Sequence, residues 1–315
     1  MEKEYSLFDL HCDTALRLAH KGLSLKDNLE CHISLVRSDY LKNYVQTFAV
    51  FTPKSYTDDE GFDNFGMVME YFEKEAQKNS RRIAVCSTAS EIRNALRDGK
   101  RAAIPAIEDA RLLGGDLDRI DYICSKGVRF VTPVWGGTSC IGGAHDTDLG
   151  LTEFGKSAVR RLAERKVILD VSHASEKTTD DILSEARAAG GMVIATHSNS
   201  ASAFNHTRNL RDRHFFEIKS MGGIVGISLC PPHISNEESP GVDSVIRHID
   251  RYMELGGEDV IAIGADLDGT DLPQGFDGIE DMYKIADRLC ELGYSTELID
   301  KIYFGNAFNF ALKNL

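Results

Sequence analysis

The sequence predicts an α/β fold, the (β/α)8 or TIM barrel, with residues 1–315 as a single domain. Eight apolar runs alternate with charged, amphipathic runs typical of helices, as in a parallel sheet whose strands are connected by helices. The apolar runs are continuous rather than alternating, which is typical of strands buried on both faces. The chain has 315 residues, 42% of them hydrophobic, which is enough for one large core.

The expected elements follow one another in a regular order. A ninth short apolar run, at 83–86, does not fit the repeat, and we expect an edge piece there, before the third strand. Thr152 and Ser175 are expected N-caps, because their side-chain oxygens can accept from free N–H groups of a first helical turn. The expected strands are 5–12, 44–51, 101–108, 128–135, 167–172, 192–197, 223–228 and 260–265, and the clearest helices are 152–166, 175–189, 212–221, 242–255 and 279–292.

Two connections between strands are unusually long or glycine-rich. The segment 52–82 is the longest insertion; we expect a loop at 53–64 followed by a helix at 65–80. The glycine-rich segment 136–150 follows the fourth expected strand. In a barrel, such a loop lies on the face that carries the active site.

Charge and composition exclude several classes of function. The formal net charge is −13 and there are no basic runs, which argues against nucleic acid or an anionic membrane surface as partner. No apolar stretch approaches the roughly 18–20 residues of a membrane span. The N-terminus lacks a signal-peptide core, so we expect a cytoplasmic protein. The seven cysteines form no CxxC pair and are expected to be free thiols, with Cys12 packing in the core.

Potential metal ligands stand at the C-terminal ends of five different strand-like runs. In a barrel these ends meet at one mouth, so the side chains are expected to converge there. Imidazole and carboxylate groups are the ligands of a two-metal hydrolase site. The residues are His11 and Asp13 after SLFDL, Glu108 after RAAIPAI, His173 after VILDVS, His197 after MVIAT and Asp266 after VIAIGA.

Each ending has a simpler explanation when taken alone. His11 and Asp13 share one face of a strand, but most such pairs are ordinary polar strand ends. Glu108 would be costly to bury unpaired, and an ion pair with Arg111 or Arg129 would also explain it. A lone strand-end histidine, such as His173 or His197, is more often a hydrogen-bonded structural residue. Five such endings in one chain make the structural explanation improbable.

Asp266 lies in the segment GADLDGTD, which is similar to a fragment of a calcium-binding loop. A glutamate at the twelfth position and flanking helices are missing, so we reject a calcium site. At the end of the eighth strand, Asp266 would face the metals as a general base. No serine nucleophile motif, Walker loop or dinucleotide fingerprint is present to compete with this interpretation.

The order of motifs resembles the membrane dipeptidase (renal dipeptidase) family of zinc peptidases, which have an amidohydrolase-like barrel. The resemblance extends over nearly the whole chain. Its motifs are DLHCDT at the N-terminus, AIEDA at Glu108, GLTEFGKSAVRRL, DVSHAS at His173, THSNSASAFNHTRNLRD from His197, IGADLDGT near 266 and the closing GNAFNF.

The resemblance implies a role for each candidate residue. His11 and Asp13 would bind one zinc ion, His173 and His197 a second, and Glu108 would bridge the two. Asp266 would handle the proton of a bridging hydroxide. Arg208 falls where the family holds the substrate's carboxylate, although from the residues alone a solvated surface arginine is the simpler interpretation.

One position departs from the family pattern. Mammalian members carry a histidine after the fourth strand that polarises the scissile carbonyl, and this chain has Trp135 in the segment VTPVWGG. Tryptophan offers only a neutral N–H donor. His145, in the glycine-rich loop, could replace the histidine, or Trp135 could only shape the pocket.

The expected function is hydrolysis of small dipeptides with a free C-terminal carboxylate, by attack of a hydroxide that bridges two zinc ions. One alternative is a metal-dependent amidase or lactonase acting on a carboxylate-bearing non-peptide substrate. Another is a zinc-binding protein without catalysis. Whether the chain forms a homodimer is left open.

Overall fold

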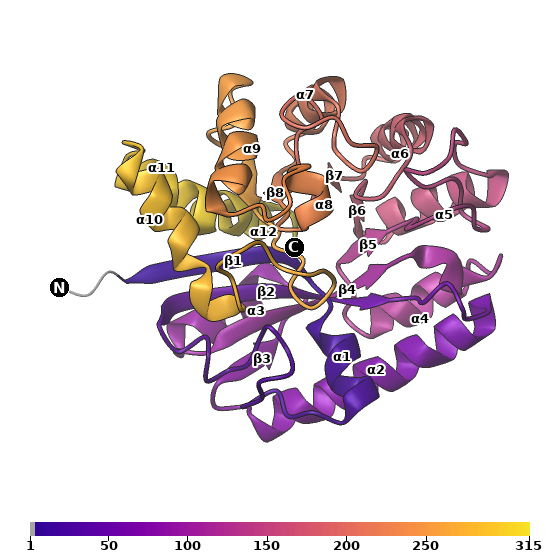
Figure 1. The fold of residues 1–315 in the computed structure, drawn as a ribbon. Helices are drawn as coiled ribbons and strands as arrows, with labels where there is room; N and C mark the ends of the chain where they lie inside the picture. Colours follow the sequence, from indigo (N-terminus) through magenta and orange to yellow (C-terminus); the bar gives the residue numbers. More distant parts are fainter. Residues whose placement is uncertain (1–3) are drawn as a thin grey trace.

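The computed structural model describes residues 4–315, and its centre is a parallel sheet that curls into a barrel (Figure 1). The strand order is β7-β6-β5-β4-β2-β1-β9-β8, and a parallel bridge between Ala195 and Val225 brings its two ends together. The predicted barrel is confirmed; that the chain is a single domain stays a prediction. The strands are β1 (Tyr5–Cys12), β2 (Leu41–Phe51), β3 (Ile83–Val85), β4 (Arg101–Glu108), β5 (Phe130–Thr132), β6 (Ile168–Asp170), β7 (Val193–Ile194), β8 (Val225–Ile227) and β9 (Ile261–Ile263).

The extra apolar run forms β3, which pairs with β4 and lies outside the barrel path, as expected. The later barrel strands are shorter than predicted. The run at 167–172 yields β6 with three residues, and 192–197 yields β7 with two. The apolar residues after them, Val171 and Ala195, are buried and continue toward the mouth of the barrel, where Ala195 forms the single bridge to Val225. Apolar content marks burial, and it overestimates the length of the paired strand.

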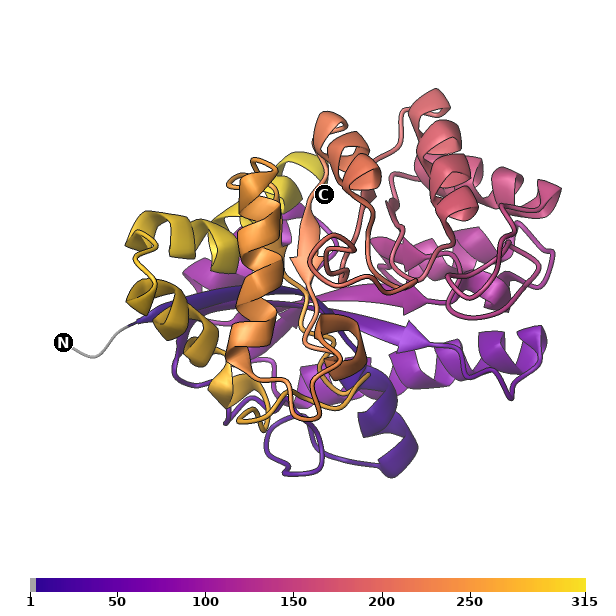
Figure 2. The same cartoon turned by 45° about the horizontal axis from the view of Figure 1, so that its top comes forward.

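The helices surround the sheet on the outside. Helices α5, α6 and α7 lie together on one side of the molecule, and α10 and α11 lie on the other in both views (Figures 1 and 2). The helices are α1 (Thr14–Lys21), α2 (Asp58–Lys78), α3 (Ala89–Arg97), α4 (Arg119–Ser125), α5 (Glu153–Glu164), α6 (Glu176–Ala188), α7 (Asp212–Ser220), α8 (Pro231–Ile234), α9 (Val242–Glu254), α10 (Tyr283–Glu291), α11 (Thr296–Asp300) and α12 (Asn306–Asn314), with 3₁₀ turns η1 (Ala110–Leu113) and η2 (Ile279–Asp281) and a π-helical turn η3 (Lys301–Gly305).

Two expected N-caps are confirmed. Thr152 accepts from the N–H of Gly155 at 2.9 Å, and Ser175 accepts from that of Thr178 at 2.9 Å. The closing segment forms α12, and the Asn306 amide ties it to β9 by donating to the carbonyl of Ile261 at 2.8 Å.

Two expected boundaries are wrong. The segment 53–64 is not all loop, because α2 begins at Asp58. Thr57 and Glu60 form a reciprocal capping box there, a local signal that outweighs the polar composition of the segment. The predicted helix 279–292 is divided into η2 and α10. Tyr40 donates to the carbonyl of Ile279 at 2.7 Å, and the N–H of Met282 bonds to the same carbonyl, so the first turn is a 3₁₀ turn.

The seven cysteines are all free thiols, and Cys12 is fully buried in the core, as predicted. Within residues 4–315, no helix combines the length and the apolar composition that crossing a bilayer requires.

Candidate metal centre

Three of the predicted site residues are placed by β1 and β4. His11 lies within β1, Glu108 is the last residue of β4, and Asp13 occupies the N-cap position of α1. All three are at least nine-tenths buried. β1 and β4 lie on either side of β2 in the barrel, so these side chains meet at the same mouth.

The other three lie just beyond short strands. His173, His197 and Asp266 each stand three residues after the last residue of β6, β7 and β9, respectively. His173 and Asp266 have φ values of 70° and 64°, in the left-handed region that residues other than glycine rarely adopt. Such conformations cost about 1–3 kcal/mol and cluster at functional sites.

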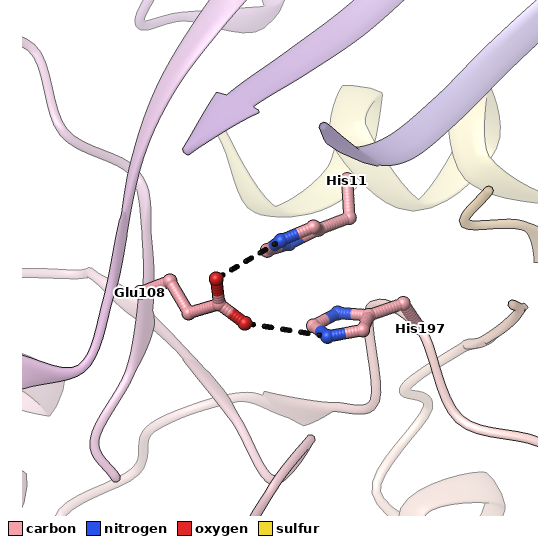
Figure 3. Close-up of side chains that lie close together, drawn as sticks. All are labelled: His11, Glu108 and His197. Atoms are coloured by element: carbon pink, nitrogen blue, oxygen red, sulfur yellow. Dashed lines mark ion pairs between the residues drawn. The ribbon is translucent and has the colours of Figure 1, made fainter. Parts of the chain in front are cut away.

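Glu108 lies at the centre of the cluster. Its Oε2 atom is 3.6 Å from His11 Nε2, whereas its Oε1 atom is 2.8 Å from His173 Nε2 and 3.4 Å from His197 Nε2. Figure 3 shows one oxygen pointing toward the imidazole of His11 and the other toward that of His197. This carboxylate can therefore hold two cations at once, one on each oxygen.

Two further carboxylates lie near the same nitrogen of His11. Its Nε2 atom lies 3.7 Å from Asp13 Oδ2 and 3.9 Å from Asp266 Oδ1. Gly269 permits this crowding, because a Cβ atom at that position would collide with both carboxylates. The sequence DLDG thus has a glycine where the metal-facing oxygens need the space.

The protonation of the cluster follows from burial and mutual charge. Burial lowers the pKa of His173 and of His197 well below the usual value, and Arg208 adds to the effect, so both imidazoles are neutral. Burial, together with the neighbouring carboxylate of Asp13, raises the pKa of Glu108 and of Asp266. For His11, burial lowers the pKa, but Glu108 and Asp13 outweigh it and raise the value well above the usual one. The cluster therefore attracts positive charge.

The donor atoms fit divalent metal ions. His11 Nε2 and Asp13 Oδ1 are buried and have no hydrogen-bond partner, which is costly unless something else binds them. Among residues 4–315, two overlapping groups have ligand atoms within 4.8 Å of one another: His11, Glu108 and His197, and His11, Asp13 and Asp266. Neutral imidazoles with carboxylates suit zinc and similar ions.

The simpler explanation for Glu108 is wrong. Arg111 pairs with Asp109 at 3.4 Å, and Arg129 donates to the carbonyl of Ser87 at 2.6 Å. Within residues 4–315, the only ion-pair partners of Glu108 are the three histidines.

Arg208 is not a surface arginine, because it is only 4% exposed. Its Nη2 atom donates to the carbonyl of His197 at 3.0 Å and its Nη1 atom to Ser198 Oγ at 3.1 Å, while Nε has no partner. No carboxylate in residues 4–315 forms an ion pair with it. Asp170, Asp266 and Glu108 attract its charge only from beyond ion-pair distance. A buried cation without a direct partner is unfavourable, so this arrangement suits an anionic ligand.

Trp135 and His145 both lie beside His173, with ring centroids at 5.9 Å and 6.1 Å from its ring. Trp135 packs on Phe51, and Lys54 Nζ lies 5.1 Å from the centre of its ring. Burial, with Arg208 nearby, lowers the pKa of His145 to about 4, so its imidazole is neutral.

Sequence reasoning missed two buried residues beneath the histidines. Asp170 is fully buried, and Thr196, the neighbour of His197, is 1% exposed; their side chains share a 2.6 Å hydrogen bond. The available signal was a carboxylate inside the apolar run VILDVSH, where an unpaired charge would be costly.

Solved structures resemble the whole chain. Dipeptidase AC, a metallopeptidase of family M19, is 27% identical with a TM-score of 0.91, and the match covers 99% of each chain. A metallopeptidase from Rhodobacter sphaeroides, solved with a phosphinate mimic of the dipeptide L-Ala-D-Ala, is 26% identical with a TM-score of 0.91, covering 99% of this chain and 100% of the other.

Sequence comparison agrees with the structural likeness. An uncharacterized protein encoded in the pqqA 5′ region of Klebsiella pneumoniae is 28% identical over 246 residues, which are 74% of this chain and 89% of that protein. The family described as membrane dipeptidase (peptidase family M19) matches residues 1–312. The chain therefore belongs to the membrane dipeptidase family, a family of metal-dependent dipeptidases.

Proposed function

We propose that this protein is a two-zinc dipeptidase that hydrolyses dipeptides with a free C-terminal carboxylate. The observation that carries the proposal is the position of Arg208. It lies buried and without a carboxylate partner, directly beside a cluster of metal-ligand side chains. A metal hydrolase needs the cluster, and a substrate with its own carboxylate explains the arginine.

The proposed metal ligands form two groups that share Glu108. His11 and Asp13 would hold one ion, His173 and His197 would hold the other, and Glu108 would offer one oxygen to each. The two Glu108 oxygens face different histidines, which supports this division. When bound, the two ions lower the pKa of water and polarise the scissile carbonyl.

The remaining residues bind substrate and move the proton. Arg208 binds the C-terminal carboxylate through charge-assisted hydrogen bonds. The carboxylate of Asp266 accepts a proton from the attacking water and passes it to the leaving amine. Beside His173, the neutral His145 can take the place of the family's carbonyl-polarising histidine, or Trp135 only shapes the pocket there.

The dipeptide mimic bound to the Rhodobacter protein supports a dipeptide as substrate class. Turnover of a stereochemically varied dipeptide library by the zinc-loaded protein tests the proposal. Hydrolysis of none of its members would contradict it. A cytoplasmic location also stays a prediction.

Replacing Arg208 with alanine should mainly impair free dipeptides. The loss of a charge-assisted pair in a pocket costs about 1.5–3 kcal/mol, which is roughly ten- to 150-fold in kcat/KM. Arg208→Lys should recover only part of this loss, because an ammonium group cannot reproduce the planar fork. The measurement is the ratio of kcat/KM for the free and C-terminally amidated forms of one dipeptide.

Arg213→Ala is the matched control, since Arg213 is half-exposed and is already paired with Asp180 and Glu176. Its discrimination between the two forms should equal that of the wild type. If Arg208→Ala also keeps the wild-type ratio, Arg208 does not bind the carboxylate, and the amidase alternative becomes the better interpretation.

A further inference from the structure

A chain of buried hydrogen bonds runs from a carboxylate to the metal-facing histidines. Asp170 Oδ1 accepts from the backbone N–H groups of Ser172 at 2.9 Å and Thr196 at 2.8 Å. Its Oδ2 atom accepts from the hydroxyls of Thr132 and Thr196, both at 2.6 Å. The Asp170 carboxylate and both threonines are at least 98% buried, so water does not substitute for these bonds.

The Thr196 hydroxyl lies between this carboxylate and two histidines. Its Oγ1 atom is 2.7 Å from His197 Nδ1 and 3.5 Å from His11 Nδ1. The Nε2 atoms of the same two imidazoles face Glu108. One hydroxyl thus touches one histidine from each of the two proposed ligand groups.

The direction of these bonds determines the tautomer. A carboxylate only accepts hydrogen bonds, so the single proton of the Thr196 hydroxyl points to Asp170. The oxygen then presents its lone pairs to the imidazoles, and His197 must carry its proton on Nδ1. The lone pair of Nε2 then points into the cluster, where it faces His173 Nε2 at 2.9 Å and is available to a metal ion. His173 differs, because its Nδ1 atom is buried without a partner.

We propose that Asp170 and Thr196 are positioning residues that hold His197, and more weakly His11, in the tautomer that binds metal through Nε2. The inference deepens the proposed function and rests on its ligand assignment. Hydrogen-bond partners behind metal ligands usually contribute 10–100-fold to metal affinity, so roughly that loss is expected when the Thr196 hydroxyl is removed.

Thr196→Val and Thr132→Val form a matched pair. Each removes one 2.6 Å hydrogen bond to the same oxygen of Asp170, but only Thr196 touches a histidine. Zinc affinity, measured by competition with a chelating dye, should fall roughly 10–100-fold for Thr196→Val and stay near wild type for Thr132→Val. Thr196→Ser retains the hydroxyl and should restore the affinity. Equal losses for both valine variants would overturn the inference.

Asp170→Asn gives a sharper test. Its amide oxygen must face the two backbone N–H groups, so its NH₂ group must face Thr196. The hydroxyl would then donate to His197 Nδ1 and move the imidazole proton to Nε2. Imidazole ¹⁵N spectra of the metal-free protein should show His197 protonated on Nδ1 in the wild type and on Nε2 in Asp170→Asn.

The wild-type spectrum depends neither on activity nor on the folding of a variant. A wild-type His197 protonated on Nε2 would overturn the inference directly. A wild type with the Nδ1-protonated tautomer that binds no zinc would instead contradict the proposed function and leave the tautomer assignment standing. The two proposals therefore fail by different results.

Discussion

Glu108→Gln should nearly abolish hydrolysis while leaving the barrel folded. An amide has one oxygen and no charge, so it cannot serve two cations from two anionic oxygens. The metal ions stabilise the transition state by several kcal/mol. Losing this stabilisation should lower kcat/KM by at least roughly 10³-fold. Elemental analysis should show fewer than two zinc ions per chain, and circular dichroism should show unchanged helix content.

Asp109→Asn is the matched control for this substitution, since it makes the same chemical change one residue along the chain. Asp109 is buried but pairs with Arg111 rather than with the histidines, and asparagine tolerates its positive φ. It should retain zinc and activity. Near-normal turnover with two zinc ions in Glu108→Gln would make Glu108 a structural residue.

Asp266→Asn should lower kcat by roughly 10²–10⁴-fold, which is the usual contribution of a general acid–base group. Asparagine keeps the shape of the side chain but cannot accept and return the proton. Zinc content should stay high if Asp266 moves the proton. A parallel loss of metal would instead make Asp266 a ligand, as its 3.9 Å approach to His11 also permits.

Asp268→Asn tests whether the neighbouring aspartate has this role. Its carboxylate accepts from Thr14 Oγ1 at 2.5 Å and from the N–H of His32 at 2.8 Å, so it ties the segment after β9 to α1 and to the loop that follows α1. We expect reduced stability and near-normal kcat. An unchanged kcat in Asp266→Asn together with a large loss in Asp268→Asn would reassign the base.

The candidate site could be predicted because its residues interrupt apolar runs at their ends. Glu108 and His11 lie on the strands themselves, so the apolar run that predicts each strand also contains the candidate ligand. His173, His197 and Asp266 lie beyond the strands. The residues between each strand and its candidate ligand are buried, so the apolar run in the sequence continues up to the ligand. The parallel topology then brings the endings together.

Other features depend on contacts that no local pattern reveals. Arg208 lies in an irregular segment after β7, where its burial depends on Ser198 and the carbonyl of His197; only the family resemblance indicated it. Asp170 and Thr196 were hidden inside runs interpreted as strand. The start of α2 was missed because the polar composition of residues 53–64 obscured the capping box that Thr57 and Glu60 form.

The most direct test of the two-metal account is the hydrolysis of one free dipeptide by metal-stripped protein, measured while zinc is added back. We expect negligible turnover without zinc and a rise to full activity that ends at two equivalents per chain. Saturation at one equivalent would contradict the shared role of Glu108, and turnover that is unaffected by removal of the metal would contradict the metal-dependent mechanism altogether.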